Sequence, residues 1–221
     1  MKLNNKRWGD FMTNNELKAI EFLKQQIWKH SEINENAKRY RYEHSLRVAE
    51  IGRRIANSEG LDAEVLALGC ILHDVGTFDS VENPKEHGRL SAKIARELLN
   101  TLDLLEERIE EICYGIAIHV DDKADFQGER TALNESIGDS DNIDRFDVYR
   151  IYDNLVYLKF DEMTLDEKLN HVNNYIPKLK GYCEMKFATK TATNIWLEKL
   201  AFQIEFYERL KAQLQRGIVI D

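Results

Sequence analysis

Proline, cysteine and long apolar runs are all scarce in this sequence. Two prolines and eleven glycines among 221 residues argue against a β-sandwich rich in tight turns and against a proline-rich disordered chain. The three cysteines, Cys70, Cys113 and Cys183, lie far apart and form no CxxC pair, so we expect neither a disulfide framework nor a thiolate zinc site. Cys70 and Cys113 fall in apolar helical patterns, where a small buried residue is expected.

A bilayer-spanning segment is also missing. No stretch approaches the roughly 18–20 apolar residues that are needed to cross a membrane, and residues 1–15 are polar and charged. We therefore expect a cytoplasmic protein without membrane association.

Basic residues are fewer than acidic residues. Lys and Arg number 31 against 39 Asp and Glu, which gives a formal net charge of −8. A protein that grips a nucleic-acid backbone normally presents a basic face, so this balance disfavours nucleic acid as a partner and a nuclease as the function. A small anionic substrate stays compatible with the charge, because a bound metal can reverse the local field of a pocket.

What the sequence does contain is helical periodicity. Nearly every segment fits the 3.6-residue period and no alternating strand pattern stands out, which predicts an all-α fold. A chain of this length can bury a core without disulfides. We expect one domain over residues 1–221, with a motif-bearing core at about 15–145 and a helical C-terminal extension at about 146–221.

Several helices can be placed from their apolar stripes. The first is expected at about 15–30, where it would bury Leu17, Ile20, Leu23 (or Phe22) and Ile27. A second helix, which carries His44, is expected to end at Gly60. Further helices are expected at 63–75, from His87 to about 98, and at 104–119. A late stripe at Trp196, Leu200, Tyr207, Leu210 and Leu214 is expected to pack on the domain's own core, and a partner-binding surface of a structural protein is the alternative.

A histidine and an aspartate stand side by side at the end of the most apolar run. His73 and Asp74 close the segment 63–75, and neither side chain belongs in a dry core without a partner. The natural partner is a cation. Adjacent residues of a helix point about 100° apart, so both can reach one ion only at a helix end.

Three further histidines occupy comparable positions. His44 begins an apolar face, His87 starts another helix and His119 ends one, so the four can converge on one point of a bundle. A single histidine on an apolar face is usually a core residue, but four with a buried aspartate favour a metal site. Mixed nitrogen and oxygen ligands suit Mn, Fe, Ni, Co, Zn or Mg. His30 and His171 lack this setting and are expected at the surface.

The motifs resemble those of a known family. Residues 42–49 (YEHSLRVA), 72–76 (LHDVG) and 139–144 (DSDNID) are similar to the successive motifs of the HD-domain metal-dependent phosphohydrolases, and 87–92 (HGRLSA) to the histidine-bearing helix that often follows the paired motif. The resemblance spans about residues 41–144. Segments 166–169 and 188–192 are similar to the end of small bacterial members, some of which act on nucleotides.

The resemblance implies an HD-domain helical bundle and a set of metal ligands. His44, His73, Asp74 and Asp141 would hold a first divalent ion, and the i, i+4 relation of Asp141 to Ile137 independently aims Asp141 inward. His87 and His119 match ligands of a second ion bridged by Asp74. Alternatively, these two histidines line the substrate pocket, where they bind phosphate or donate protons.

Two positions depart from related branches. Thr77 stands where a nucleotidase-like branch has a glutamate and a cyclic-dinucleotide branch a lysine, so neither specific mechanism is carried over. Asn142 stands where a basic residue is common, and Arg145 follows three residues later.

The main functional hypothesis is hydrolysis of a small phosphate ester or phosphoanhydride, with a nucleotide as the favoured substrate. Asp74 would orient the attacking water, and His87 or His119 would protonate the leaving oxygen. The cations nearest in sequence, expected to bind substrate, are Arg47, Arg89, Lys123 and Arg145. A non-catalytic sensor of metal and nucleotide fits the same ligand set. The sequence indicates no oligomeric state.

Overall fold

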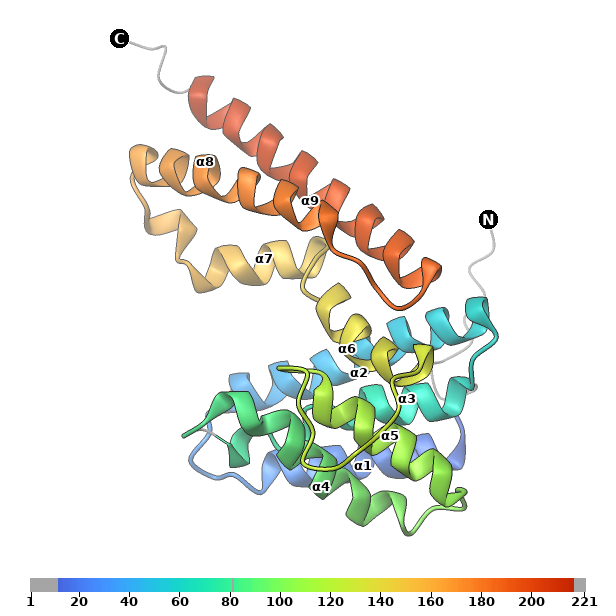
Figure 1. The fold of residues 1–221 in the computed structure, drawn as a ribbon. Coiled ribbons are helices and arrows are strands. Elements are labelled where there is room, and N and C mark those ends of the chain that lie inside the picture. The colour runs from blue at the N-terminus through green and yellow to red at the C-terminus, as the bar shows by residue number, and fades with distance from the viewer. Residues whose placement is uncertain (1–11, 81, 217–221) are drawn as a thin grey trace, which may run out of the picture. The chain divides into compact units, whose positions relative to one another are not determined.

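The computed structural model describes residues 12–80 and 82–216, and within these ranges every regular element is a helix. The all-α prediction is confirmed. The main helices are α1 (Asn14–Trp28), α2 (Glu35–Glu59), α3 (Ala63–Leu72), α4 (His87–Leu99), α5 (Glu106–Ile118), α6 (Ala132–Ile143), α7 (Val148–Tyr157), α8 (Leu165–Gly181) and α9 (Lys190–Arg216), as Figure 1 shows. Two short 3₁₀ turns, η2 (Thr77–Asp79) and η3 (Pro84–Glu86), lie between α3 and α4.

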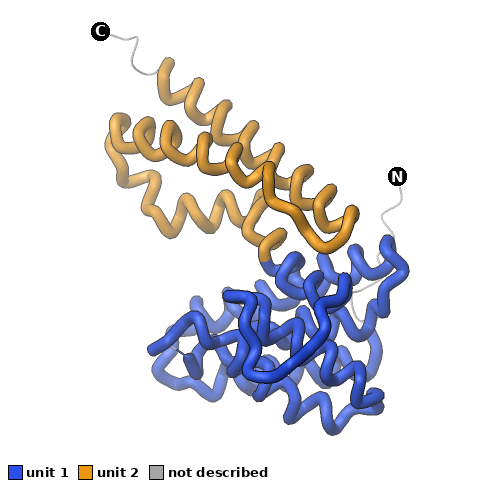
Figure 2. Tube along the Cα trace, viewed as in Figure 1, with its two compact units in different colours: residues 1–141 blue, residues 142–221 orange. Residues whose placement is uncertain are grey.

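The chain divides into two compact units, residues 1–141 and 142–221 (Figure 2). The boundary falls in the last turn of α6, close to residue 145, where the sequence predicts that the core ends. The single-domain organisation stays a prediction. No described helix is long and apolar enough to cross a membrane.

Helix α3 is the centre of the N-terminal unit. Eight consecutive residues, 65–72, are buried, and the helix contacts α1, α2, α4 and α5. This burial follows from the sequence, because a helix that is apolar on all sides has to be covered on all sides. Each fully buried Leu or Ile of α3 contributes roughly 1.5–3 kcal/mol. Cys70 and Cys113 are buried free thiols, as predicted.

The ends of α2 are set by local chemistry. The Asn34 side chain accepts a hydrogen bond from the Ala37 backbone N–H at the start, and Gly60 ends the helix at φ +70°. Glycine adopts this left-handed conformation without the Cβ clash that other residues meet. The predicted end of this helix is therefore confirmed, and α2 carries His44 in its interior with Val48, Ile51 and Ile55 buried on the same stripe.

Two local predictions are wrong. Leu17 of α1 is 47% exposed, whereas Glu16 is buried and its carboxylate pairs with Arg53 Nη2 at 3.0 Å. The buried stripe of α1 is Glu16, Ala19, Leu23 and Ile27. The prediction is therefore confirmed for Leu23 and Ile27, and the stripe lies one position away from it only in the first turns. Helix α3 ends at Leu72 rather than near residue 75, because tight turns follow, with Val75 N–H donating to the Leu72 carbonyl.

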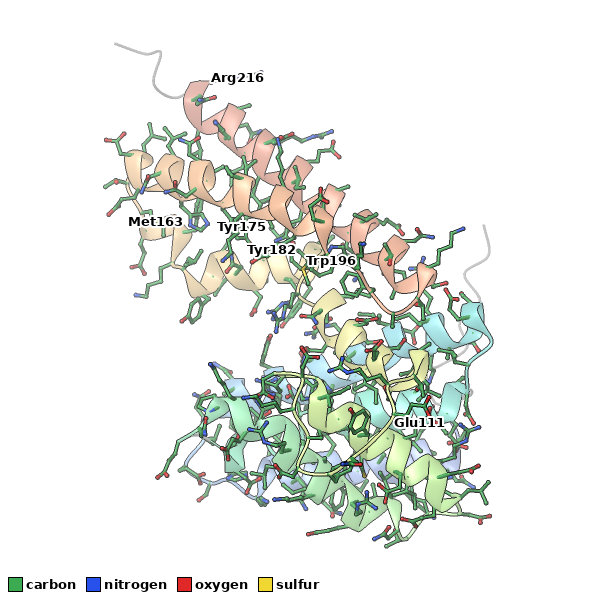
Figure 3. All side chains as sticks on the ribbon, viewed as in Figure 1. Glu111, Met163, Tyr175, Tyr182, Trp196 and Arg216 are labelled. Carbon is green, nitrogen blue, oxygen red and sulfur yellow. The ribbon has the colours of Figure 1, made fainter. Side chains whose placement is uncertain are left out.

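The C-terminal unit has an aromatic core between α8 and α9. Trp196 is buried, and its indole N–H donates to the Tyr182 carbonyl at 3.0 Å; Figure 3 labels both residues. Of the predicted stripe, Trp196, Leu200 and Tyr207 are buried, while Leu210 and Leu214 are half-buried. The stripe therefore packs on its own unit over most of its length.

Candidate metal centre

His73 and Asp74 lie directly after the last residue of α3, both buried. The chain turns sharply here, with Thr77 N–H donating to the Asp74 carbonyl at 3.0 Å and Gly76 N–H to Ser91 Oγ at 2.9 Å. A Cβ at Gly76 would lie 3.0 Å from the Ser91 backbone nitrogen, so glycine allows α4 to approach this closely. The helix end thus turns two adjacent side chains toward one point, as the sequence predicts.

Asp74 lies between two groups of ligands. Its Oδ2 atom is 3.3 Å from His73 Nε2 and 3.6 Å from His44 Nε2. Its Oδ1 atom is 3.0 Å from His87 Nε2 and 3.7 Å from His119 Nε2. One carboxylate therefore faces imidazoles from four separate segments of the chain.

Asp141 joins the His44 side of this arrangement. From the last turns of α6, its Oδ1 atom lies 3.1 Å from His44 Nε2 and 3.8 Å from His73 Nε2. Two sets of potential ligand atoms each lie within 4.8 Å of one another: those of His44, His73 and Asp141, and those of His73, Asp74 and His119. We refer to these residues together with His87 as the His–Asp cage.

Three cage histidines share one hydrogen-bond pattern. The Nδ1 atoms of His73, His87 and His119 lie 2.8, 2.5 and 2.6 Å from the carbonyl oxygen of the residue three positions earlier. An Nδ1–H that donates to a carbonyl leaves Nε2 of the neutral ring as the lone-pair atom. This is the outer-shell arrangement that orients metal-ligating histidines. His44 also faces the cage through its Nε2 atom, which lies 3.1 Å from Asp141 Oδ1.

Several cage atoms lack a hydrogen-bond partner that would explain their burial. His73 Nε2 and Asp74 Oδ1 are both buried without a hydrogen bond among the described residues. His87 Nε2 and His119 Nε2 approach to 3.2 Å, which two lone pairs do only with a proton or a cation between them. Leaving buried polar atoms unsatisfied costs about 1–3 kcal/mol each. The donor set and these orphaned atoms fit a divalent cation.

The cage carboxylates are held in their ionised form. Burial alone would raise the pKa of Asp74, but the adjacent His73 and the Arg41 guanidinium outweigh burial and hold this pKa well below its ordinary value. Burial would also raise the pKa of Asp141, but the hydrogen bond with His44 outweighs it and lowers this pKa below its ordinary value. Both buried carboxylates are therefore in the form that can bind a cation.

His87 is the most accessible of the cage histidines. Its side chain is 21% exposed, compared with 2% for His119 and 0% for His73. Burial lowers the pKa of His87, but the neighbouring Asp74 carboxylate outweighs burial and raises this pKa above its ordinary value.

Arg41 is a site residue that sequence reasoning missed. Its guanidinium forms an ion pair with Asp74 Oδ2 from the turn of α2 that precedes His44. The spacing of Arg41 and His44 could have indicated this role, because residues three positions apart lie on one face of a helix.

The four predicted substrate-binding cations lie in different surroundings. Arg89 is 3.0 Å from Asp121 Oδ1, and half-buried Arg47 has polar contacts of its own. Lys123 is exposed in the loop after α5, and Arg145 is exposed in the C-terminal unit. Arg41 thus pairs with a cage carboxylate, whereas Arg89 pairs with Asp121.

The two remaining histidines are not surface residues, and that prediction is wrong. The His30 side chain is 12% exposed, with Nε2 at 3.3 Å from Asp79 Oδ2. His171 is half-buried and stacks on Tyr175 with ring centroids 5.5 Å apart, where burial lowers its pKa. An ion pair thus accompanies the burial of His30, and aromatic packing accompanies that of His171, although neither residue belongs to an apolar stripe.

Comparison with known proteins agrees with the geometry. The family model of the HD domain matches residues 41–147, a range that contains the whole cage. An uncharacterized protein of Clostridium beijerinckii is 33% identical over 113 residues, which are 50% of this chain and 71% of that protein.

A solved structure shares the fold. The crystal structure of a predicted HD superfamily hydrolase from an uncultured Thermotogales bacterium matches with a TM-score of 0.66, over 94% of this chain and 99% of that chain. The two sequences are 16% identical, so this likeness concerns the fold alone. The match of the HD-domain model to residues 41–147 confirms the family predicted from the motifs: the chain belongs to the HD-domain superfamily.

Proposed function

We propose that the chain is a metal-dependent phosphohydrolase that cleaves a phosphate ester or phosphoanhydride of a small molecule, with a nucleotide as the first candidate. The observation that carries the proposal is the position of Asp74. Its two buried oxygens face separate sets of imidazole nitrogens, and Arg41 adds a guanidinium at the same carboxylate. Such a set of groups suits phosphoryl chemistry, which depends on positioning and on charge stabilisation.

The first metal would be held by His44, His73, Asp74 and Asp141. Mixed imidazole and carboxylate ligands suit Mn, Fe, Ni, Co, Zn or Mg. A divalent ion bound there would supply a Lewis acid for a phosphoryl oxygen and would lower the pKa of water.

The chain's own residues supply the proton transfers. Asp74 is ionised and buried, so its carboxylate can orient the attacking water and accept a hydrogen bond from it. His87 is the better of the two candidate acids for the leaving oxygen, because a leaving group has to depart toward solvent and His119 is almost fully buried. His119 then orients Asp74 from the inner side.

Charge that develops on the phosphoryl oxygens needs a cation beside the metal. Arg41 is the best placed, since its guanidinium already reaches the cage and its side chain is 25% exposed. Arginine binds phosphate in a bidentate way that lysine does not match. Arg47, Arg89, Lys123 and Arg145 are proposed only as outer contacts of the substrate.

The direct test measures metal content and phosphate release on the same preparation. Nucleoside mono-, di- and triphosphates and cyclic nucleotides form the panel, and His73→Ala and Asp74→Ala serve as ligand variants. We expect bound metal and turnover in the wild type, and loss of both with retained helicity in the variants. Metal content that is unchanged in both variants would refute the ligand assignment. Metal and nucleotide binding without turnover would favour a sensor.

Metal stoichiometry decides the role of His87 and His119. If both hold a second ion, the wild type binds two ions per chain and His87→Asn binds one. If His87 is a proton donor instead, both proteins bind one ion and only turnover falls in the variant.

A further inference from the structure

A cavity of about 510 Å³ lies in the N-terminal unit, outside the His–Asp cage. The segments that carry the cage residues continue directly into its wall. Phe78 follows Asp74 by four positions, Glu86 directly precedes His87, and Arg89 follows His87 by two. The wall of the cavity and the cage thus share one stretch of chain between Asp74 and Lys93, and His87 is the cage residue nearest to the cavity along the chain. We call this cavity the side pocket.

The charged side chains of the side pocket are mostly acidic. Its wall contains four carboxylates and two cations: Asp79, Glu82, Glu86, Asp125, Arg89 and Lys93. Both cations are already paired. Arg89 Nη1 lies 3.0 Å from Asp121 Oδ1, and Lys93 Nζ lies 3.4 Å from Asp125 Oδ2. In both cases a carboxylate of the protein therefore competes with an anion of the substrate for the cation.

Two acids of the wall are poorly compensated. Among the described residues no cation lies within ion-pair distance of Glu82, and the nearest to Glu86 is Arg89 Nη2 at 3.9 Å. Asp79 differs, because it pairs with Lys29 Nζ at 3.0 Å. The carboxylates of Glu82 and Glu86 therefore make this part of the wall negative, and a second anion in a substrate would meet repulsion there. Lys85 lies between them in the sequence, but it does not line the side pocket.

The remaining wall suits an uncharged organic group. Phe78 and Leu90 are half-buried and line the side pocket, and the Phe78 ring is held edge-on by His30 at a centroid distance of 5.8 Å. Ser80 and Asn83 add polar groups. Ligand sites commonly combine apolar walls with a few polar groups that fix orientation.

We propose that the side pocket receives the part of the substrate that is not hydrolysed, and that it selects for an uncharged or cationic group there. The inference rests on the proposed phosphohydrolase function and narrows it. The preferred substrates are phosphate monoesters whose organic part carries no second anion.

A matched series of esters tests this selection. The three probes are hexyl phosphates whose far end is a hydroxyl, an ammonium or a carboxylate group, compared by kcat/KM for phosphate release from the metal-loaded protein. We expect the ammonium and hydroxyl esters to exceed the carboxylate ester by about tenfold or more at low salt. The difference should shrink as ionic strength rises, because exposed charges are screened.

The double variant Glu82→Gln, Glu86→Gln assigns the effect to the side pocket. It should bring the ratio between hydroxyl and carboxylate esters to within about twofold, since two uncompensated charges are removed. Glu97→Gln is the matched control: Glu97 is an exposed acid of α4 outside the pocket wall, and its variant should keep the wild-type ratio. Equal kcat/KM for all three esters, or an unchanged ratio in the double variant, would overturn the inference and leave the proposed function standing.

Absence of hydrolysis with every ester and with the whole nucleotide panel would instead refute the proposed function. The dissociation constants of the same three esters for the metal-loaded protein then test the side pocket alone. Weaker binding of the carboxylate ester that the double variant abolishes supports the selection. Equal binding of all three overturns it.

Discussion

Replacing His73 by asparagine separates metal ligation from the packing role of this residue. His73 is fully buried, and its Nδ1–H donates to the Cys70 carbonyl at 2.8 Å. The asparagine amide nitrogen takes the place of Nδ1 and can keep this hydrogen bond, whereas nothing replaces Nε2, the atom that faces Asp74 and Asp141. We therefore expect a protein that folds but no longer responds to metal.

The size of the response can be worked out in advance. At free metal 100 times the dissociation constant, the wild type gains about 2.7 kcal/mol of stability. For a chain of this length that corresponds to a rise in Tm of about 5–11 °C. Loss of a direct ligand should weaken affinity by about 100-fold or more, which leaves a gain of about 0.4 kcal/mol and a shift of about 1–2 °C at the same metal concentration.

Thermal unfolding with a chelator and with added Mn²⁺ or Zn²⁺ measures both shifts. Without metal, His73→Asn should lose about 1–2 kcal/mol for the missing ring atoms. His171→Asn is the matched control, because His171 belongs to the C-terminal unit, and it should keep the full metal-dependent shift. A metal-dependent shift of wild-type size in His73→Asn would refute the assignment of its Nε2 as a ligand.

Three further substitutions test the cation beside the cage, the packing of its helices and its carboxylates. Arg41→Met should raise KM for a phosphate ester by about 10–100-fold through lost charge-assisted hydrogen bonds, with metal content by elemental analysis unchanged; an unchanged KM would contradict a role in substrate binding. Gly115→Ala places a Cβ 2.6 Å from the Asn134 carbonyl oxygen. Urea denaturation should show a free energy of unfolding that is lower by about 1–3 kcal/mol, and wild-type stability would contradict tight packing of α5 on α6. Because the pKa of Asp141 is lowered in the folded chain, its ionised carboxylate stabilises the fold above the ordinary carboxyl pKa of about 4, and this contribution is lost progressively as pH falls from there toward the lowered value. In chelator, Asp141→Asn should therefore show a shallower loss of Tm between about pH 5 and 3 than the wild type, and parallel curves would contradict the argument.

The cage could be predicted because each ligand has a local signature. Asp141 follows Ile137 by one helical turn, and Ile137 is fully buried. The sequence of this helix alone therefore predicts that Asp141 points inward. His73 and Asp74 close an apolar run whose burial is dictated by composition. Convergence of the segments then follows from burying all of these faces in one core.

The misplaced elements depend on partners that are distant in sequence. Glu16 is buried on α1 because Arg53, 37 residues away, pairs with its carboxylate. An apolar pattern alone assigns that position to solvent and Leu17 to the core. The end of α3 is likewise fixed from outside, since Ser91 of α4 accepts the hydrogen bond of Gly76 and so holds the turn beside the cage.

The same reasoning explains why the substrate is harder to predict than the metal. A ligand such as His119 needs only a helix end and the carbonyl three residues earlier, so its orientation is determined within one turn. Arg41 reaches Asp74 across 33 positions, and the side pocket takes its form from loops that contacts such as His30–Asp79 hold in place. The residues proposed to contact the organic part of a substrate lie in these loops and carry no periodicity of their own. The proposal therefore predicts that substitutions at residues 78–80 and 82–86 change the choice of substrate at little cost to the helices that carry the His–Asp cage.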